Sequence, residues 1–327
     1  MRTSRRAAAI AVVAALVLTA CGGGEQDAAE PAPAPAPAPD APTEPELTGS
    51  VRIDGSSTVA PFAEVAAELF MQENPGVQVT VGTSGTGGGF EKFCNGETDI
   101  SNASRSIKDE EAAICQEGSI AFEEVLVALD GLAVVVSSDN DFATCLTVEE
   151  LATIWGPDAE GTVTSWKQVR ADFPDERIDL YGPGTDSGTF DFFTGAINGE
   201  EGASRADFNA SEDDNVIVQG VSGSKGGTGY FGLSYLLENA GALKGVEVDG
   251  GDGCVAPATE TVLDGTYTPL SRPLFMYPSD AALARPEVVA FLDFVIANQA
   301  AIAQAALFVP LSDTLLAESQ AKVDSLK

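Results

Sequence analysis

Short apolar strands alternate with amphipathic helices along most of the chain, from residue 51 onward. Residues 51–53 and 77–82 have the composition of strands, and the segment "APFAEVAAELFMQE" between them has apolar residues at helical spacing. The helix pattern stops at "NPG", a strong helix-ending sequence. This alternation predicts an α/β fold with buried, mostly parallel sheets.

Three of the strand–helix junctions are rich in Gly, Ser and Thr: "IDGSSTVAPF", "VGTSGTGGGFEKF" and "LYGPGTDSGTFDFF". The first backbone N–H groups of a helix have no intrahelical partner, and the helix dipole adds partial positive charge there. Glycine lets a bound oxyanion approach this backbone closely. N-capping by Ser, Thr or Asp is the simpler explanation for any single turn. Three such turns in one chain favour an oxyanion site.

A fourth segment, "NASRSIKDEE", places Arg105 between a short strand and an acidic helix start. A surface salt bridge with Asp109 or Glu110 would account for Arg105 taken alone. Because the chain also has three oxyanion-type turns, Arg105 is a candidate to bind an anion through two hydrogen bonds of its guanidinium group.

The charge balance narrows the classes of partner. The 327 residues, enough for two domains, include 50 acidic and 17 basic side chains, with a formal net charge of −33. This argues against nucleic acid or an anionic membrane surface as the main partner. The chain has no His, which removes the commonest general base and the commonest metal ligand. We therefore expect no metal site, no cofactor and no enzyme activity.

The N-terminus predicts export. Residues 1–20 combine an Arg-containing start with a short apolar run, and "LTAC" places small residues before Cys21. This closely resembles a bacterial lipoprotein signal, in which Cys21 carries the lipid; the alternative is an ordinary signal with a chance Cys. Residues 21–49 include a Pro-Ala repeat that predicts an extended tether. We expect a protein anchored to the cell membrane and facing the periplasm or the exterior.

An even number of cysteines follows Cys21 in this exported chain, which suggests two disulfides. The four cysteines allow three pairings, and their spacings do not resemble a zinc site. We favour the pairs Cys94–Cys115 and Cys145–Cys254, because each Cys lies near a Gly-rich or polar turn.

Taken together, the motifs resemble the phosphate-binding proteins of bacterial phosphate ABC transporters, a branch of the type II periplasmic-binding-protein fold. "DGSSTVAPF", "GTSGTGGGF", "DISNASRSIKDEE", "YGPGTDSGTFDFF", "GYFG" and "PLSRPLFMY" recur in that family in this order, over about residues 50–310. The resemblance implies two lobes, residues 50–137 plus 270–327 and residues 138–269. Crossing strands near 134–138 and 270–277 would join them. It further implies a monomeric receptor that clamps inorganic phosphate and delivers it to an ABC permease.

The resemblance also implies a set of ligand-binding residues in the turns. By motif these are Ser57, Thr58 and the Val59 N–H in the first turn, Thr86 and Gly87 in the second, and Ser187, Gly188 and Thr189 in the third, with Ser84 and Ser104 as further neighbours.

Two positions depart from one well-known form of the family. That form has an aspartate where Ser104 stands, which accepts the proton of hydrogen phosphate, and an arginine where Pro183 stands. We infer that Arg105 replaces the missing arginine from the opposite lobe. Asp186 is the candidate for the missing acceptor, although it could instead cap the helix that follows.

Other functions remain open at this point. The site could bind another oxyanion, such as sulfate or molybdate. An exported phosphate-ester hydrolase could use Ser187 as nucleophile, but no His is present to activate it. An adhesin or signalling lipoprotein could keep the fold without the ligand.

Overall fold

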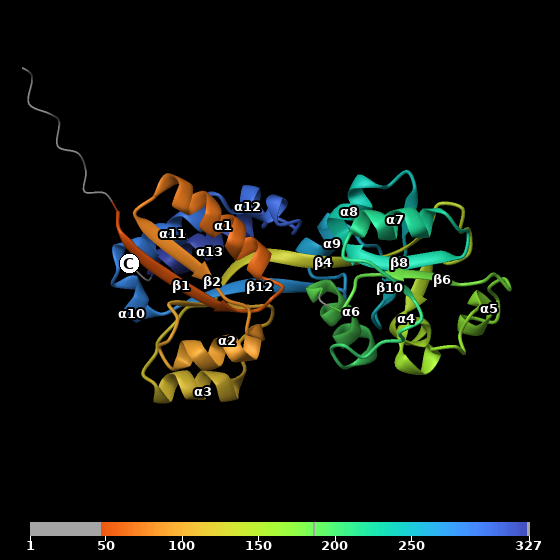
Figure 1. The fold of residues 1–327 in the computed structure, drawn as a ribbon, viewed down its shortest axis with the longest axis horizontal. Helices are drawn as coiled ribbons and strands as arrows, with labels where there is room; N and C mark the ends of the chain where they lie inside the picture. Colours follow the sequence, from red (N-terminus) through yellow and green to blue (C-terminus); the bar gives the residue numbers. More distant parts are fainter. Residues whose placement is uncertain (1–46, 186, 326–327) are drawn as a thin grey trace, which may run out of the picture. The chain divides into compact units, whose positions relative to one another are not determined.

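The structure is a computed structural model that describes residues 47–185 and 187–325, and these belong to one compact unit. Cys21, the expected signal peptide and nearly all of the expected tether lie outside the described residues, as does Asp186. The chain has the mixed α/β architecture that the sequence predicts (Figure 1).

The first lobe is a sheet covered on both faces. β1 lies between β2 and β3 and runs parallel to both, and β12 pairs antiparallel with β3. Helices α1 and α11 cover one face and α2 covers the other (Figure 1). The elements of this lobe are β1 (Gly49–Gly55), α1 (Ala60–Glu73), β2 (Val77–Val81), α2 (Gly85–Cys94), β3 (Ile100–Ala103), α3 (Asp109–Glu117), β12 (Ser271–Pro278), α10 (Asp280–Leu283), α11 (Pro286–Ala297), α12 (Gln299–Ala305) and α13 (Asp313–Ser325).

The long strand β4 (Val125–Ser137) belongs to both lobes. Its first half pairs antiparallel with β12, with Asp130 opposite Arg272, and its second half pairs antiparallel with β8, beginning with Leu132 opposite Gly232. The change of partner therefore falls between Gly131 and Leu132, before the expected crossing at residues 134–138. We expected mostly parallel sheets. The strands toward the outside of each lobe are parallel, but the strands that cross between the lobes pair antiparallel with their neighbours.

The second lobe continues the same sheet through β8, β6 and β7, and adds a small sheet of β11, β10 and β5. Its elements are β5 (Cys145–Thr147), α4 (Val148–Trp155), α5 (Trp166–Val169), β6 (Asp179–Gly182), α6 (Gly188–Asn198), β7 (Asn209–Ala210), α7 (Asp214–Ser222), β8 (Gly227–Gly232), α8 (Leu233–Glu238), β9 (Leu243–Gly245), β10 (Glu247–Asp249), β11 (Cys254–Val255) and α9 (Thr259–Leu263), with a short 3-10 helix at Pro157–Ala159.

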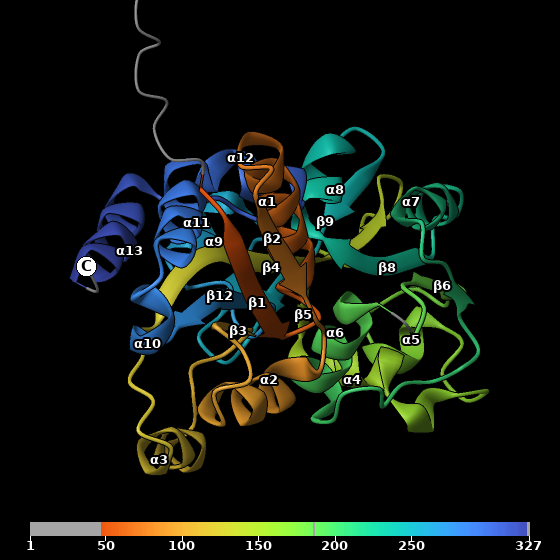
Figure 2. The ribbon, with the colours of Figure 1, turned by 60° about the vertical axis from the view of Figure 1, so that its left-hand side comes forward.

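An aromatic cluster fixes helix α6 in the second lobe. Phe193 of α6 stacks on Tyr230 with ring centroids 3.7 Å apart, and Trp155 meets both rings edge-on. All three side chains are fully buried. The ring contacts hold α6 by its middle against α4, the helix that ends at Trp155 (Figure 2). A Cβ on its first residue, Gly188, would lie 3.3 Å from Thr58 Oγ1 of the first lobe.

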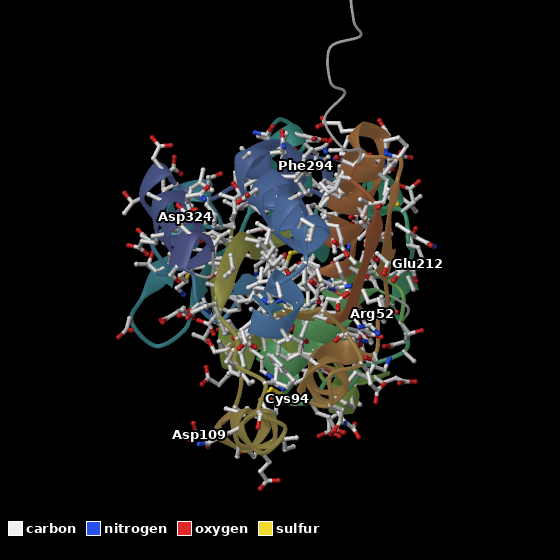
Figure 3. All side chains as sticks on the ribbon, turned by 90° about the vertical axis from the view of Figure 1, so that its left-hand side faces the viewer. Arg52, Cys94, Asp109, Glu212, Phe294 and Asp324 are labelled. Atoms are coloured by element: carbon white, nitrogen blue, oxygen red, sulfur yellow. A yellow bond between two sulfur atoms is a disulfide. The ribbon has the colours of Figure 1, made fainter. Side chains whose placement is uncertain are left out.

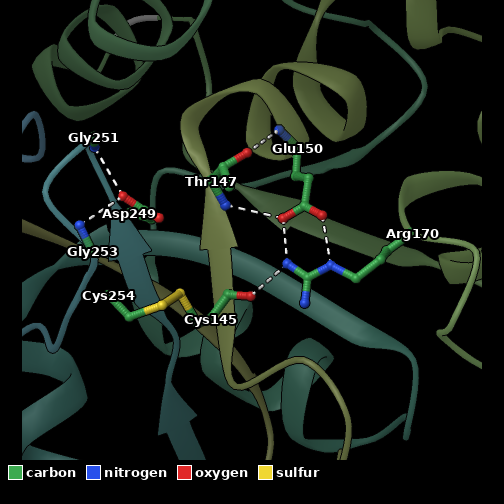
Figure 4. The surroundings of a disulfide bond; sticks show 8 residues. All are labelled: Cys145, Thr147, Glu150, Arg170, Asp249, Gly251, Gly253 and Cys254. Carbon is green, nitrogen blue, oxygen red and sulfur yellow. Dashed lines mark hydrogen bonds and ion pairs between the residues drawn. A yellow bond between two sulfur atoms is a disulfide. The ribbon is translucent and has the colours of Figure 1, made fainter.

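Both favoured disulfides are present. Cys94–Cys115 joins α2 to α3, and Figure 3 shows Cys94 close to the helix that begins at Asp109. Cys145–Cys254 joins β5 to β11, next to the ion pair between Arg170 and Glu150 (Figure 4).

No single helix within the described ranges is long and apolar enough to cross a membrane. Helices α11 and α12 satisfy that criterion only when taken together, and they are bent by 76° at the break between them.

Candidate functional site

The N-termini of α1, α2 and α6 come together between the lobes. The turns before them, together with the first helical residues of α2 and α6, line two adjoining cavities of about 470 and 210 Å³, which share Ser57 and Thr58. The larger cavity also has Thr86, Gly87, Ser104 and Arg105 in its wall, and the smaller one has Ser187, Gly188 and Thr189. The structure therefore gathers most of the residues predicted from the three turns at one place, from both lobes.

The first turn depends on a tight backbone approach. Gly55 has a φ of +142°, and a Cβ there would lie 2.1 Å from the carbonyl oxygen of Asn102 in β3. The chain can therefore turn into α1 directly beside β3 only with glycine at this position. Val59 is the N-cap residue of α1 and its side chain is fully buried.

The second turn is tied to the strand end that carries Ser104. The Thr86 and Ser104 hydroxyls lie 3.2 Å apart, and the Ser104 N–H donates to Thr86 Oγ1 at 3.3 Å. Ser84 makes different contacts: its hydroxyl and N–H both donate to Asp54 Oδ1, at 2.6 and 2.9 Å. Burial raises the pKa of Asp54, but hydrogen bonds from Lys92 and Ser84 outweigh it and lower the pKa to about 2. Ser84 thus holds the turn in place and is absent from the described walls of both cavities.

Arg105 lies at the wall of the larger cavity with its guanidinium already paired. Its Nη1 and Nη2 donate to the two carboxylate oxygens of Glu111, each at 2.8 Å, and these bonds raise the pKa of Arg105. The partner is Glu111 of α3, whereas the sequence suggested Asp109 or Glu110. An added Cβ at Gly87 would lie 4.0 Å from Arg105 Nη2, so this guanidinium borders the second turn.

The third turn brings the second lobe against the first. Ser187 caps α6, since its Oγ accepts from the Thr189 N–H at 3.2 Å. A Cβ at Gly188 would lie 3.3 Å from Thr58 Oγ1, so the backbone of one lobe approaches the hydroxyl of the other. Glycine at 188 is what permits this approach.

Sequence reasoning missed an arginine at the centre of this arrangement. Arg272 of β12 donates from Nε to Asp130 Oδ2 at 3.1 Å and from Nη2 to Thr58 Oγ1 at 2.8 Å. Its guanidinium carbon lies 3.8 Å from the ring centre of Phe192 in α6. The side chain is 13% exposed, and burial lowers its pKa. Arg272 thus contacts both lobes and faces the larger cavity.

The chemistry of this wall suits a small oxyanion. It offers hydroxyl groups, a buried guanidinium and three helix N-termini, all of which donate hydrogen bonds or carry positive partial charge. Among the described residues, the one group with metal-binding spacing is Cys145, Glu247 and Cys254, and its two cysteines form a disulfide.

Comparisons with known proteins identify the family of the chain. Residues 40–299 match the PBP superfamily domain. The chain belongs to the PBP superfamily. Over 262 residues it is 49% identical to protein SphX of Synechococcus elongatus, covering 80% of this chain and 77% of that protein. It is 40% identical over 319 residues to the phosphate-binding protein PstS of Staphylococcus saprophyticus, covering 97% and 92%. The crystal structure of a possible phosphate binding protein from Planctomyces limnophilus superposes with a TM-score of 0.82 at 44% identity, covering 86% and 99%.

Within this PBP-superfamily chain, the sequence did carry a signal for Arg272 and Asp130. Each is a lone charged residue in an apolar strand, in "PLSRPLFMY" and "LVALDGLAVVV". A buried charge needs a partner, and the two residues lie opposite each other in the β4–β12 pairing. The sequence signal was therefore one isolated charged residue in each crossing strand. The two residues, Asp130 and Arg272, are 142 positions apart in the chain.

Proposed function

We propose that this protein is a lipid-anchored extracytoplasmic receptor that binds inorganic phosphate between its two lobes and delivers it to an ABC permease. The convergence of the N-termini of α1, α2 and α6 around Arg272 is the observation that carries the proposal. The name of the relative phosphate-binding protein PstS, the structure of a possible phosphate binding protein and the signal-like N-terminus support it. Cys21 is the proposed lipid-bearing residue.

In this proposal phosphate accepts hydrogen bonds from both lobes. The residues proposed to bind it are Ser57, Thr58, the Val59 N–H, Thr86, Gly87, Ser187, Gly188 and Thr189, together with Arg105 and Arg272. Ser104 supports the second turn through Thr86. Asp186 stays a prediction, because it lies outside the described residues.

A binding role accords better with these residues than catalysis does. The Ser187 hydroxyl, the one candidate nucleophile, accepts the Thr189 N–H as a helix cap. A serine nucleophile needs an adjacent base, and the chain has no His to supply one.

Calorimetric titration of the chain from residue 22, stripped of bound ligand, tests the proposal. We expect one phosphate to bind with a dissociation constant of about a micromolar or below, and sulfate to bind at least about a hundredfold more weakly. Equal binding of the two anions would leave an oxyanion receptor without phosphate selectivity. Failure of both anions to bind would overturn the receptor function.

A further inference from the structure

Most of the exposed large apolar side chains belong to elements on one side of the molecule. In the described part of the chain, five such side chains are between 37% and 53% exposed: Leu69, Ile114, Val216, Leu237 and Leu307. Four of them belong to α1, α7, α8 and the turn after α12, and these helices lie along the upper side of Figures 1 and 2. The fifth, Ile114, belongs to α3, on the lower side of both views. Exposed apolar side chains that gather in this way mark an interaction site, whereas scattered ones do not.

Two hollows make this surface continuous across the lobes. The first, of about 270 Å³, lies between α8 of the second lobe and the segment after α12 in the first lobe, and its wall includes Leu237 and Leu307. The second, of about 410 Å³, lies between α1 and the end of α12, and its wall includes Val65 and again Leu307. We call this surface, from Val65 across Leu307 to Leu237, the apolar face. A partner that fills both hollows contacts both lobes.

The backbone at Leu307 is strained in a way that glycine would avoid. α12 ends in a Schellman motif, in which the Leu307 N–H donates to the Gln304 carbonyl at 3.1 Å and the Phe308 N–H donates to the Ala303 carbonyl at 2.8 Å. Leu307 takes the left-handed position of this motif, with a φ of +64°, where glycine is the usual residue. Its side chain is nevertheless 44% exposed. Neither feature stabilises the fold, and backbone strain of this kind is concentrated at functional positions.

The borders of the apolar face are acidic. Glu64 and Glu68 of α1 and Glu238 of α8 are exposed in the walls of the two hollows. None of the three has an ion-pair partner within residues 47–185 and 187–325. The sequences of α1, α7, α8 and α12 and of residues 306–310 contain no Lys or Arg. Such a surface repels anionic lipid and a second copy of this chain, which has a net charge of −33. It fits a protein that presents apolar side chains flanked by Lys or Arg.

We propose that the apolar face docks on extracytoplasmic loops of the ABC permease, and that these loops present apolar side chains flanked by Lys or Arg. The inference rests on the proposed function, because it names the surface through which phosphate is delivered. Leu237 and Leu307 contact the apolar side chains of the loops, and Glu64, Glu68 and Glu238 pair with the flanking cations. Leu307 also lines the smaller ligand cavity, so a permease docked here lies next to the bound phosphate.

Photocrosslinking in the source cells tests the location of the contact. The full-length receptor carries p-benzoylphenylalanine in place of Leu237 or, as a matched control, in place of Ile114; these side chains are 53% and 46% exposed. We expect position 237 to crosslink to a permease subunit, identified by mass spectrometry, and position 114 to give no such product. A product with a second receptor or with lipid, a permease product from position 114 alone, or no product from position 237 overturns the inference.

Phosphate uptake by cells that carry single variants tests the chemistry of the contact. Leu237→Lys places a cation where cations of the permease are expected, so uptake should fall at least about tenfold. The phosphate affinity of the purified variant should be unchanged, because Leu237 is absent from the described walls of both ligand cavities. Ile114→Lys should change neither quantity. Unchanged uptake with Leu237→Lys overturns the inference and leaves the proposed function intact.

Charge reversal tests the acidic border separately. The double variant Glu68→Lys and Glu238→Lys should lower uptake without changing phosphate affinity. The double variant Glu97→Lys and Glu117→Lys changes the net charge equally, at exposed positions after α2 and in α3, and should keep uptake. Equal losses in the two double variants would mean that only the net charge matters, and the docking surface would be wrong.

Leu307→Gly separates a docking role from a structural one. If leucine is kept for docking, glycine relieves the backbone strain, so the midpoint of thermal unfolding should not fall. Uptake, measured at saturating phosphate, should nevertheless fall by about threefold or more. A lower unfolding midpoint with unchanged uptake would show that leucine serves the fold, and would overturn the inference. Absence of phosphate binding by the unchanged receptor, or uptake that does not depend on it, contradicts the proposed function itself.

Discussion

Two arginines border the ligand cavities, and their surroundings predict different contributions to binding. The Arg272 side chain is 13% exposed and bonds to Thr58, whereas the Arg105 side chain is 36% exposed and is paired with Glu111. We expect Arg272→Met to weaken phosphate binding by about 2–5 kcal/mol, as for loss of a buried charge partner. Arg105→Met should cost about 1 kcal/mol, because solvent screens that charge. Calorimetry measures both, and Arg272→Lys should recover only part of the loss. Equal losses in the two Met variants would contradict this ranking.

At the residue scale, the sequence predicted the donors of the turns better than the charges between the lobes. Ser57, Thr58, Thr86 and Gly87 each lie in a local strand–turn–helix pattern, and the structure brings all four to the wall of one cavity. Ser84 fits the same pattern, yet its hydroxyl bonds to Asp54, a residue in the preceding strand. The partner of Arg272 depends on the pairing of β4 with β12, which no local pattern specifies.

At the scale of elements, the Cys94–Cys115 disulfide holds the helix that positions Arg105. Cys115 is the one buried residue of α3, which the structure describes in full, and Glu111 of the same helix pairs with Arg105. With so little apolar surface, α3 depends on the disulfide to stay against α2. Replacing Cys94 and Cys115 by Ala should therefore weaken phosphate binding about as much as Arg105→Met does.

The second disulfide supplies the matched control. Cys145–Cys254 closes a separation of 109 residues against 21 for Cys94–Cys115, so its loss should lower the free energy of unfolding by about 5 rather than about 3 kcal/mol. It joins β5 to β11, outside the ligand cavities, so phosphate affinity should be kept. Urea unfolding followed by fluorescence of the buried Trp155 and Trp166 gives the stability, and calorimetry the affinity. The idea fails if the two double variants lose affinity equally.

The sequence predicted the elements of this fold more closely than their pairing. Each Gly-rich turn does precede a helix, at Ala60, Gly85 and Gly188, although of the three N-cap residues Ser187 alone caps its helix through its side chain. The sequence did not show that β4 would exchange β12 for β8 between Gly131 and Leu132. Residues 132–136 are uniformly apolar and buried, and such a run shows that a strand is covered on both faces without showing which strand lies beside it.

At the scale of the whole molecule, the net charge of −33 repels at long range the same anion that the cavities are proposed to attract at short range. The distant acidic charges repel phosphate, but in physiological salt they are screened beyond about 8 Å. The donors of the three turns and Arg272 act at contact distance, where salt screens them far less. Selectivity is therefore a local property, whereas the affinity for phosphate and the stability of the fold also depend on the net charge of the whole protein.

This separation predicts an unusual response to salt. Raising KCl from about 10 to about 150 mM should increase phosphate affinity, by about two- to fivefold, because it screens the long-range repulsion while leaving the local donors in place. The midpoint of thermal unfolding should rise over the same range, since the excess acidic charge destabilises the compact state. Calorimetry and thermal unfolding at matched pH measure the two effects, with sodium gluconate in place of KCl as a control for competition by chloride. A fall in affinity with either salt would mean that the positive field of Arg272 and the helix N-termini reaches beyond the cavity and outweighs the acidic surface.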